Sequence, residues 1–324
     1  MVRNKLLIVL SVLLLPLFAA AKSRDSLAYT NHKEFYFHWD NDIFVFKDYY
    51  YTQGAHLYLV NPALRKNPAN HLFFKLKNAD NYFGIGAVQE IYTPKDLRDT
   101  LANLVDRPYA GTFYVRSFLT SVLPHQKLRL TTELDLGFLG PLSGAEEAQR
   151  IIHEWLGLDW PQGWDFQIKN RPYLNYNMLI EKEFIEVPGF FDFTGSARGR
   201  FGNIHDDLQL GAQIRLGRMN NQFKGLHLAN KAYTENRDFE MYFFADVKGS
   251  IVFYNATLMG GIIAPKNDHD FKYNQIEPFL GEFNCGIRLN YKFIGTAGTV
   301  TWKTPEFETG EQHGWGTISM FFRF

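Results

Sequence analysis

The stretch that decides the fold is Glu34 to Val60, which reads EFYFHWDNDIFVFKDYYYTQGAHLYLV. From Glu34 to Trp39 an aromatic residue occupies every second position, and from Ala55 to Val60 the residues Ala55, Leu57 and Leu59 alternate with His56, Tyr58 and Val60. A period of two is typical of β-strands, whose side chains point to opposite faces of the sheet. The stretch therefore predicts a β-hairpin at the start of a larger sheet.

Polar side chains gather where the two halves of this hairpin meet. Asp40, Asn41 and Asp42 follow the first half, and Thr52 comes ten residues after Asp42 at the start of the second. A hairpin brings the end of one strand beside the start of the next, so we expect these groups at one end of the sheet. Asp-Asn-Asp at a strand end is also common turn chemistry, and spacing alone leaves that alternative open.

Ten further segments with alternating hydrophobicity follow the hairpin along the chain. They are residues 81–92, 110–121, 127–139, 173–185, 190–201, 207–216, 239–252, 278–291, 293–303 and 315–324. Most have about ten residues, the length expected of strands that cross a bilayer at a tilt. In the last segment Ile318, Met320, Phe322 and Phe324 share one face. This apolar face, with an aromatic residue at the chain end, indicates the closing strand of a barrel.

The composition indicates where this sheet lies. Aromatic residues make up 16% of the chain, with 30 Phe and 17 Tyr. Beyond the N-terminal segment, no apolar run reaches the ~18 residues of a membrane-spanning helix. We therefore predict an all-β fold, a 12-stranded antiparallel transmembrane β-barrel with a short helix in an extracellular loop. A soluble periplasmic β-protein is the alternative.

The N-terminal residues predict export. Arg3 and Lys5 precede an apolar run over residues 6–18, which is followed by three alanines at positions 19–21. A basic start, a short apolar core and small residues form a signal peptide. We expect a signal peptide at residues 1–21 and one outer-membrane β-barrel domain at residues 22–324. The only cysteine, Cys285, excludes an internal disulfide. The 34 basic and 34 acidic residues argue against nucleic acid as a partner.

One segment follows a helical pattern. Ser143 and Glu146 have the spacing of a capping box, and Gly157 is placed to end the helix. Apolar residues follow with helical spacing at Ala148, Ile151, Ile152, Trp155 and Leu156. We expect this apolar stripe to anchor the helix, with His153 at its edge facing a polar space.

Topology brings these separate polar groups to one end of the barrel. An even number of strands puts both termini and the short turns in the periplasm and the longer loops outside. Asp42, Thr52, Arg107 and His153 all fall at or in outside connections on this scheme. Such a rim suits hydrolysis of an ester at the membrane surface. Asp42 and Asp40 are oxygen donors suited to Ca²⁺, and a histidine can serve as general base because imidazole titrates near neutral pH.

The same residues resemble the outer-membrane lipid A 3'-O-deacylase family (LpxR-like). The resemblance spans residues 34–324 and is strongest over 34–175. It is carried by Asn41-Asp42, Tyr51-Thr52-Gln53-Gly54, Asp106-Arg107-Pro108-Tyr109-Ala110-Gly111, Leu139-Gly140-Pro141, Glu147-Ala148-Gln149, His153 and Gly163-Trp164-Asp165.

The resemblance implies a Ca²⁺-dependent esterase that faces the cell exterior and removes the 3'-acyloxyacyl chain from lipid A. By position, Asn41, Asp42, Thr52 and His153 match the family's active-site residues. The implied mechanism has His153 activating water while Ca²⁺ at Asp42 stabilises the oxyanion. Arg107 is the candidate substrate-binding residue, and we expect a monomer.

Two other functions compete with this one. The first is a serine-dependent outer-membrane phospholipase, for which Ser143 is the serine nearest His153 in the sequence. The second is a non-enzymatic barrel, a pore or an adhesin. The sequence holds no G-x-S-x-G elbow, H-E-x-x-H zinc motif or P-loop.

Overall fold

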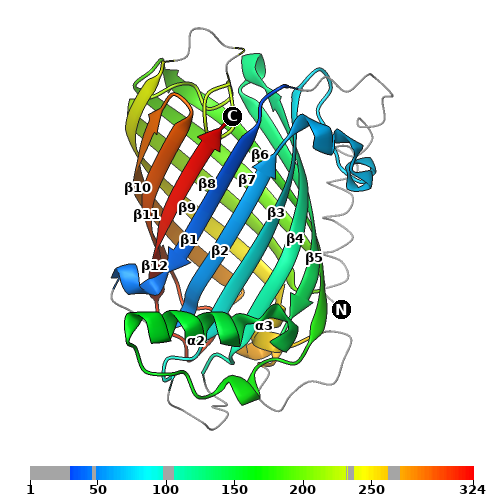
Figure 1. Cartoon of the computed structure of the whole chain (residues 1–324), viewed down its shortest axis with the longest axis vertical. Helices are drawn as coiled ribbons and strands as arrows, with labels where there is room; N and C mark the ends of the chain where they lie inside the picture. The colour runs from blue at the N-terminus through cyan, green and yellow to red at the C-terminus, as the bar shows by residue number, and fades with distance from the viewer. Residues whose placement is uncertain (1–29, 46–48, 98–105, 231, 233–236, 262–270) are drawn as a thin grey trace.

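The computed structural model of the chain describes residues 30–45, 49–97, 106–230, 232, 237–261 and 271–324. Over these ranges, twelve antiparallel strands close into one barrel (Figure 1). The strands are β1 Glu34–Asn41, β2 Tyr50–Val60, β3 Asp80–Thr93, β4 Ala110–Leu123, β5 Leu128–Leu139, β6 Arg171–Val187, β7 Phe191–Gly202, β8 His205–Arg218, β9 Phe239–Asn255, β10 Phe279–Tyr291, β11 Ile294–Lys303 and β12 His313–Arg323. The fold class predicted from the sequence is confirmed. The expected signal peptide lies outside the described residues.

Short helices occupy the connections between strands. The α-helices are α2 Ala145–Leu156 and α3 Ala256–Met259. The 3₁₀ turns are η1 Asp42–Val45, η2 Pro62–Lys66, η3 Pro68–His71, η4 Pro124–Gln126, η5 Pro141–Ser143, η6 Trp164–Phe166 and η7 Tyr273–Gln275. Among the described residues, no helix is both long enough and apolar enough to cross a membrane.

The barrel closes because its first and last strands pair with each other. Glu34 of β1 lies opposite Arg323 of β12, and Asn41 lies opposite Gly316. The second strand begins earlier than its sequence suggests, at Tyr50. Thr52 consequently lies within β2, at an irregularity of the β2–β3 register between Tyr51 and Gln53.

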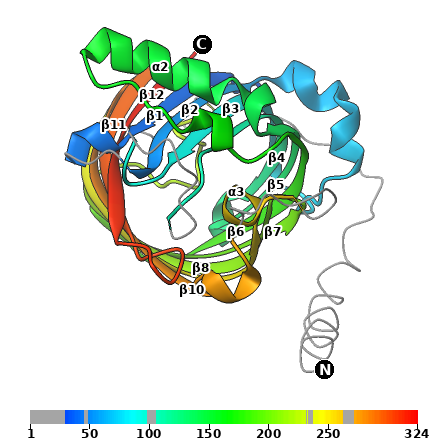
Figure 2. The same ribbon diagram turned by 90° about the horizontal axis from the view of Figure 1, so that it is seen from below.

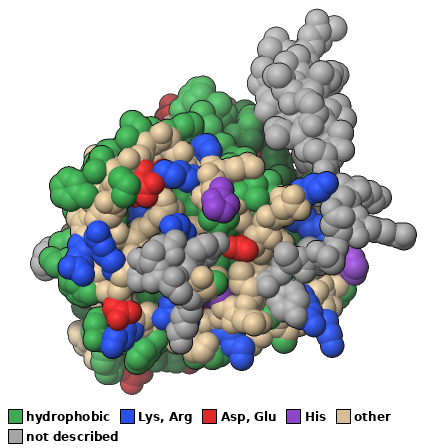
Figure 3. All heavy atoms as spheres, turned by 90° about the horizontal axis from the view of Figure 1, so that it is seen from above, with side chains coloured by type: hydrophobic (Ala, Val, Ile, Leu, Met, Phe, Trp, Pro, Cys, Tyr) green, Lys and Arg blue, Asp and Glu red, His purple; other side chains and the backbone are tan. Residues whose placement is uncertain are grey.

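The two ends of the barrel differ. At one end, the lower one in Figure 1, lie η1, α2 and α3 and the connections that carry them. The strand β1 begins and β12 ends at the opposite end, where most connections are tight turns. Figure 3 looks onto that opposite end. It shows apolar side chains around the periphery and charged or other polar groups toward the middle.

The wall has an apolar outer face and a polar inner face. Outward residues such as Leu57 and Leu136 are 46% and 52% exposed. Inside, charges are paired across neighbouring strands: Arg116 Nε donates to Asp135 Oδ1 at 2.7 Å, and Lys248 Nζ lies 2.8 Å from Glu282 Oε1. Alternation along each strand produces this division, as expected of a barrel whose outer face meets lipid.

The described residues that follow β8, from 219 to 230, fold into the lumen. Phe223 and Leu228 are buried there. His227 Nδ1 lies 2.7 Å from Glu34 Oε1, and the backbone amide of Leu228 donates to the same carboxylate. The alternating pattern of the strands gives no sign of this inward fold, because it depends on contacts between residues nearly 200 positions apart.

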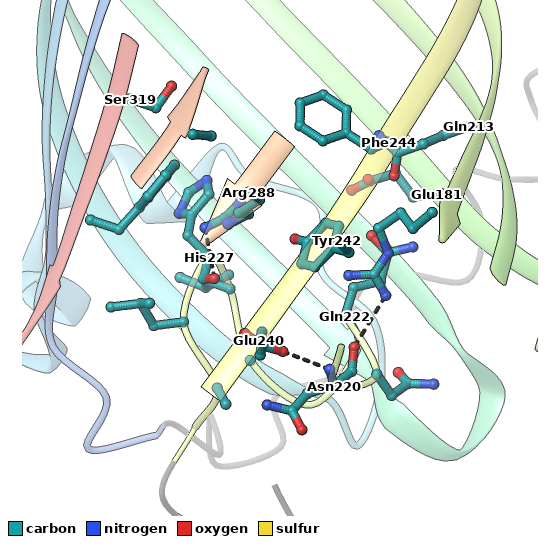
Figure 4. A pocket seen from close by; sticks show the side chains of 18 of the residues that line it. Glu181, Gln213, Asn220, Gln222, His227, Glu240, Tyr242, Phe244, Arg288 and Ser319 are labelled. Carbon is teal, nitrogen blue, oxygen red and sulfur yellow. Dashed lines mark hydrogen bonds between the residues drawn. The ribbon is translucent and has the colours of Figure 1, made fainter. Parts of the chain in front are cut away.

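Beside this segment the lumen keeps a cavity of about 290 Å³. Figure 4 shows Asn220 and Gln222 of the β8–β9 connection on one side of it, with Tyr242 and Glu240 of β9 and Arg288 of β10 nearby. The backbone amide of Asn220 donates to Glu240 Oε1. The cavity therefore lies inside the barrel, in the half that holds the β8–β9 connection.

Candidate functional site

Helix α2 lies outside the ring of strands, against the outer face of the wall (Figures 1 and 2). Its start packs on Gly111 of β4, where an added Cβ would come within 2.1 Å of the Ala145 Cβ and 2.4 Å of Ser143 Oγ. Only glycine permits so close an approach. Gln89 of β3 adds a hydrogen bond from Nε2 to the Ser143 carbonyl at 2.8 Å.

The helix does not begin with the expected capping box. Ser143 belongs to η5, and the N-cap is Gly144 in the left-handed conformation with φ of 67°. Ser143 Oγ accepts only the Ala145 amide, at 3.3 Å. The preceding 3₁₀ turn already fixes Ser143, so the capping-box prediction is wrong. The predicted end is confirmed: Gly157 has φ of 69°, and its amide bonds back to the last turn.

Only part of the apolar stripe faces the barrel: Ala148 packs against the buried cluster of Ile91, Tyr109, Ala145 and Trp164. Ile151 and Trp155 are 56% and 79% exposed, whereas Gln149 and His153 are almost fully buried. The sequence expectation assumed that apolar residues face the protein, as in soluble proteins. Here Gln149 and His153 face the wall together with Ala145 and Ala148, so the expectation is wrong for Ile151 and Trp155.

A row of outward-facing residues runs across the wall beneath the helix. Asn41 of β1 pairs with Gln53 of β2, Gln53 with Ile91 of β3, and Ile91 with Gly111 of β4. Asn41 and Gln53 are only 5% and 6% exposed, although they lie on the outer face of the wall. Cover from outside the barrel accounts for that burial.

The length of the helix matches the length of this row. Three strand spacings separate Gly111 from Asn41, about 14 Å. Eight residues of helix separate Ala145 from His153, about 12 Å. Since α2 starts over β4 and runs across the strands toward β1 (Figure 1), His153 is carried toward the Asn41 and Gln53 end of the row.

The ring of His153 is held in one orientation. His153 Nδ1 lies 2.6 Å from the Asp159 carbonyl oxygen. A carbonyl only accepts, so Nδ1 carries the proton of the neutral ring and Nε2 keeps its lone pair. This arrangement suits a general base.

The other expected active-site residues lie on or beside the same face. Thr52 Oγ1 shares a hydrogen bond of 2.7 Å with Thr93 Oγ1, and Thr93 follows Ile91 by two positions on the outward side of β3. Asn41 Oδ1 accepts the Ile43 amide. Asp42, at the start of η1, is 2% exposed, and its Oδ2 accepts the Tyr49 amide at 2.8 Å.

Asp40 lies on the other side of the wall. Its Oδ1 accepts Thr317 Oγ1, and its Oδ2 accepts Tyr51 Oη, both at 2.7 Å. His56 Nε2 is 3.3 Å from the same oxygen. Alternation turns Asp40 into the lumen while Asn41 faces out, so the expectation that Asp40 joins Asp42 as a metal ligand does not fit the structure.

Arg107 also turns inward. Nη1 donates to Glu306 Oε2 at 2.5 Å and Nη2 to Thr257 Oγ1 at 2.7 Å, and the guanidinium lies 4.3 Å from the centre of the Tyr92 ring. Burial by itself raises the pKa of Glu306, but the charges of Lys303 and Arg107 outweigh it and hold that pKa far below its usual range. Arg107 is 1% exposed. It ties three connections together inside the barrel mouth, which does not fit the expected contact with substrate.

Gln149 is a member of the site that sequence reasoning did not select. It lies one turn before His153 on the same flank and is 1% exposed. Its Oε1 accepts the Trp164 indole N–H at 2.9 Å, and its Nε2 is buried without a hydrogen-bond partner among the described residues. The spacing of four residues from His153 was the available signal.

Ser143 is badly placed for the serine-hydrolase alternative. Ten residues of α2 and its start separate it from His153, a rise of about 15 Å. A nucleophile and its base need hydrogen-bond contact. The distance therefore argues against Ser143 as a nucleophile activated by His153.

The oxygen-bearing side chains at the site include one carboxylate that could bind a hard cation such as Ca²⁺, but they do not form a complete set of ligands. Among the described residues no three His, Cys, Asp or Glu side chains gather as a metal site. Asp42 offers one buried carboxylate, and Asn41 and Thr52 offer neutral oxygens nearby in the sequence. Ca²⁺ takes oxygen ligands of this kind together with backbone carbonyls and water, so Asp42 remains the residue that fits such an ion.

A closed β-barrel with an apolar outer face is the architecture of outer-membrane β-barrels. In this chain a polar site also lies beside a helix at the rim. The model of the family described as outer membrane protein LpxR matches residues 6–324, so the chain belongs to the LpxR family.

A solved structure of an LpxR protein shares the fold, and two other solved structures match with lower TM-scores. LpxR from Salmonella typhimurium has a TM-score of 0.73 and 21% identity and covers 90% of this chain and 100% of its own. The beta domain of the Bordetella autotransporter Brka has a TM-score of 0.43 and 9% identity, covering 90% and 97%. An outer membrane channel from Pseudomonas putida F1 has a TM-score of 0.42 and 7% identity, covering 94% and 99%. No curated protein matches the chain.

Proposed function

We propose that this protein is an outer-membrane esterase that removes the 3'-acyloxyacyl chain from lipid A, with its site facing the cell exterior. Membership of the LpxR family supports the activity class. The observation that carries the chemistry is His153, buried between α2 and the wall with Nδ1 bound to the Asp159 carbonyl. A buried histidine with a fixed tautomer, on the lipid side of a barrel, suits hydrolysis of a membrane lipid.

His153 is the general base in this proposal. Its Nε2 takes a proton from a water molecule as that water attacks the ester carbonyl carbon, and the proton then passes to the leaving alkoxide. The Asp159 carbonyl stabilises the imidazolium that forms, because its hydrogen bond to Nδ1–H strengthens when the ring is charged. The products are the free acyloxy fatty acid and the shortened lipid.

The negative charge that develops on the ester carbonyl oxygen must be stabilised by hydrogen-bond donors or a cation. Gln149 Nε2 is one, since it is buried beside His153 and has no partner among the described residues. A Ca²⁺ ion held by Asp42 would polarise the carbonyl and stabilise the oxyanion. Asn41 and Thr52 would orient substrate or water from the wall side, where their own hydrogen bonds hold them.

The test is mass spectrometry of lipid A from cells that express the protein. We expect the wild type to remove one acyloxyacyl unit, and His153→Ala and Asp42→Ala to leave lipid A intact. Folding of each variant is checked by heat-modifiable mobility on gels. An unchanged lipid A spectrum from a folded wild-type barrel would overturn the proposal.

A further inference from the structure

Helix α2 has two flanks besides the one that faces the barrel, and their chemistry differs. Successive residues of an α-helix are rotated by about 100°. Relative to the buried flank of Ala145, Gln149 and His153, one neighbouring flank carries Ile151 and Trp155, both largely exposed. The opposite flank carries Glu146, Glu147, Arg150 and Glu154.

The direction of the helix fixes where each flank points. α2 begins over Gly111 of β4 and runs toward β1 across the outer face, along the lower rim in Figure 1. For a right-handed helix on that course, the flank with Ile151 and Trp155 turns along the wall toward the middle of the strands. The charged flank turns away from the barrel.

The apolar flank continues an apolar wall. On β4 the next outward residues beyond Gly111 are Phe113 and Val115, 39% and 40% exposed. Their partners on β5 are Phe138 and Leu136, which are also exposed. This wall is the lipid-facing surface of the barrel, so the flank of α2 and the wall form one surface.

We propose that the apolar flank of α2 docks on the acyl-chain layer of the outer leaflet, with Trp155 and Ile151 as its anchors. An amphipathic helix with an apolar flank and a charged flank lies at the membrane interface, and tryptophan is enriched there. The occupant is lipid rather than a second copy of the chain, because the flank runs without a break into a belt that lipid already covers. This inference does not depend on the proposed hydrolysis.

The docking gives α2 a second role. His153 lies on the buried flank of the same helix, so the docking holds this histidine close to the lipids of the surrounding leaflet.

The test measures the depth of labels on the full-length barrel. Cys285→Ser removes the native cysteine, and nitroxide labels are then placed at Trp155→Cys, Phe113→Cys and Glu147→Cys. Each protein is reconstituted at one barrel per nanodisc of phosphatidylethanolamine and phosphatidylglycerol. The readout is label accessibility to molecular oxygen, which partitions into hydrocarbon, against a nickel chelate, which stays in water.

We expect the oxygen-to-nickel ratio at Trp155→Cys to match the wall position Phe113→Cys and to exceed Glu147→Cys several-fold. A ratio equal to that of Glu147→Cys overturns the proposal. The proposal is also overturned if the label at Trp155→Cys is accessible to the nickel chelate in discs with one barrel and shielded only in discs with two. A second copy of the chain would then be the occupant. If Trp155→Cys fails to fold, Ile151→Cys carries the same prediction.

Discussion

The two faces of the barrel wall at the α2 rim hold similar residue types and have different chemistry. On the outer face, Asn41 and Gln53 are buried, and α2, which carries His153, packs against the neighbouring strands β3 and β4. On the inner face, Asp40 and His56 lie within 3.3 Å of each other in the lumen. Inside, carboxylates already have partners. Outside, polar donors and a histidine are buried on the lipid side of the wall, which is the arrangement that the proposed hydrolysis of a membrane lipid needs.

The largest expected effect is a difference in hydrolysis rate between alanine variants of two histidines, His153 and His56. We expect His153→Ala to lower the rate of acyl release about 10²–10⁴-fold, the usual contribution of a general base. His56→Ala, in the lumen, should leave the rate close to wild type. The measurement is fatty-acid release from lipid A in mixed micelles, per folded barrel. The reverse order of the two variants would move the active site into the lumen.

The second effect concerns the ion pair inside the barrel mouth. We expect Arg107→Ala to lower the free energy of unfolding, but by less than the ~3–5 kcal/mol that an unpaired buried charge costs, because Lys303 still pairs with Glu306 at 2.7 Å. Replacing both residues by apolar ones should cost much less. Urea unfolding in phospholipid vesicles measures this. If Arg107→Ala keeps wild-type stability and instead raises KM, Arg107 contacts substrate after all.

The third effect compares two neighbouring carboxylates. Asp42→Asn, or removal of Ca²⁺ by EGTA, should lower activity about 10²–10³-fold, as expected for loss of one oxyanion-stabilising element. Asp40→Asn should keep both the activity and its calcium dependence. Rates across a calcium titration distinguish the three proteins. Full activity in EGTA would remove Ca²⁺ from the mechanism.

The fourth effect tests the close contact between α2 and Gly111 of β4. Gly111→Val should push α2 from the wall and lower activity by up to about 10²-fold, since small misplacements of catalytic groups have effects of that size. Gly249→Val is the matched control, because a Cβ at Gly249 meets nothing within 4 Å. Barrel folding should be preserved in both. Equal activity of the two variants would show that α2 does not need this close contact.

The smallest effect is in the pH dependence of stability. The pKa of Glu306 is lower in the folded barrel than in the unfolded chain, because Lys303 and Arg107 outweigh the effect of burial. Its contribution is therefore present above the unfolded-state value of about 4.3 and is lost as the pH falls below it. Glu306→Gln should flatten the acid side of the profile. An unchanged slope between wild type and Glu306→Gln would contradict this assignment.

Local sequence patterns were enough to predict the barrel. Period-two alternation needs only neighbouring residues, so all twelve strands and the short helix could be located from local patterns alone. Alternation also predicts that Asn41 and Asp40 face opposite sides of the wall, since they are adjacent residues of one strand. At the rim, this alternation places Asp40 in the lumen, on the other side of the wall from the site.

The side of α2 that faces the protein depends on tertiary contacts and could not be predicted from the sequence. The sequence contains one apolar stripe, and in a soluble protein such a stripe is buried. Here Ala148 packs against buried residues while Ile151 and Trp155 are exposed, since lipid rather than protein surrounds the rim in our proposal. The partners of Arg107 were also beyond reach, because Glu306 and Thr257 lie about 200 and 150 positions away. Contacts between residues so far apart depend on how the barrel closes, and no local pattern encodes them.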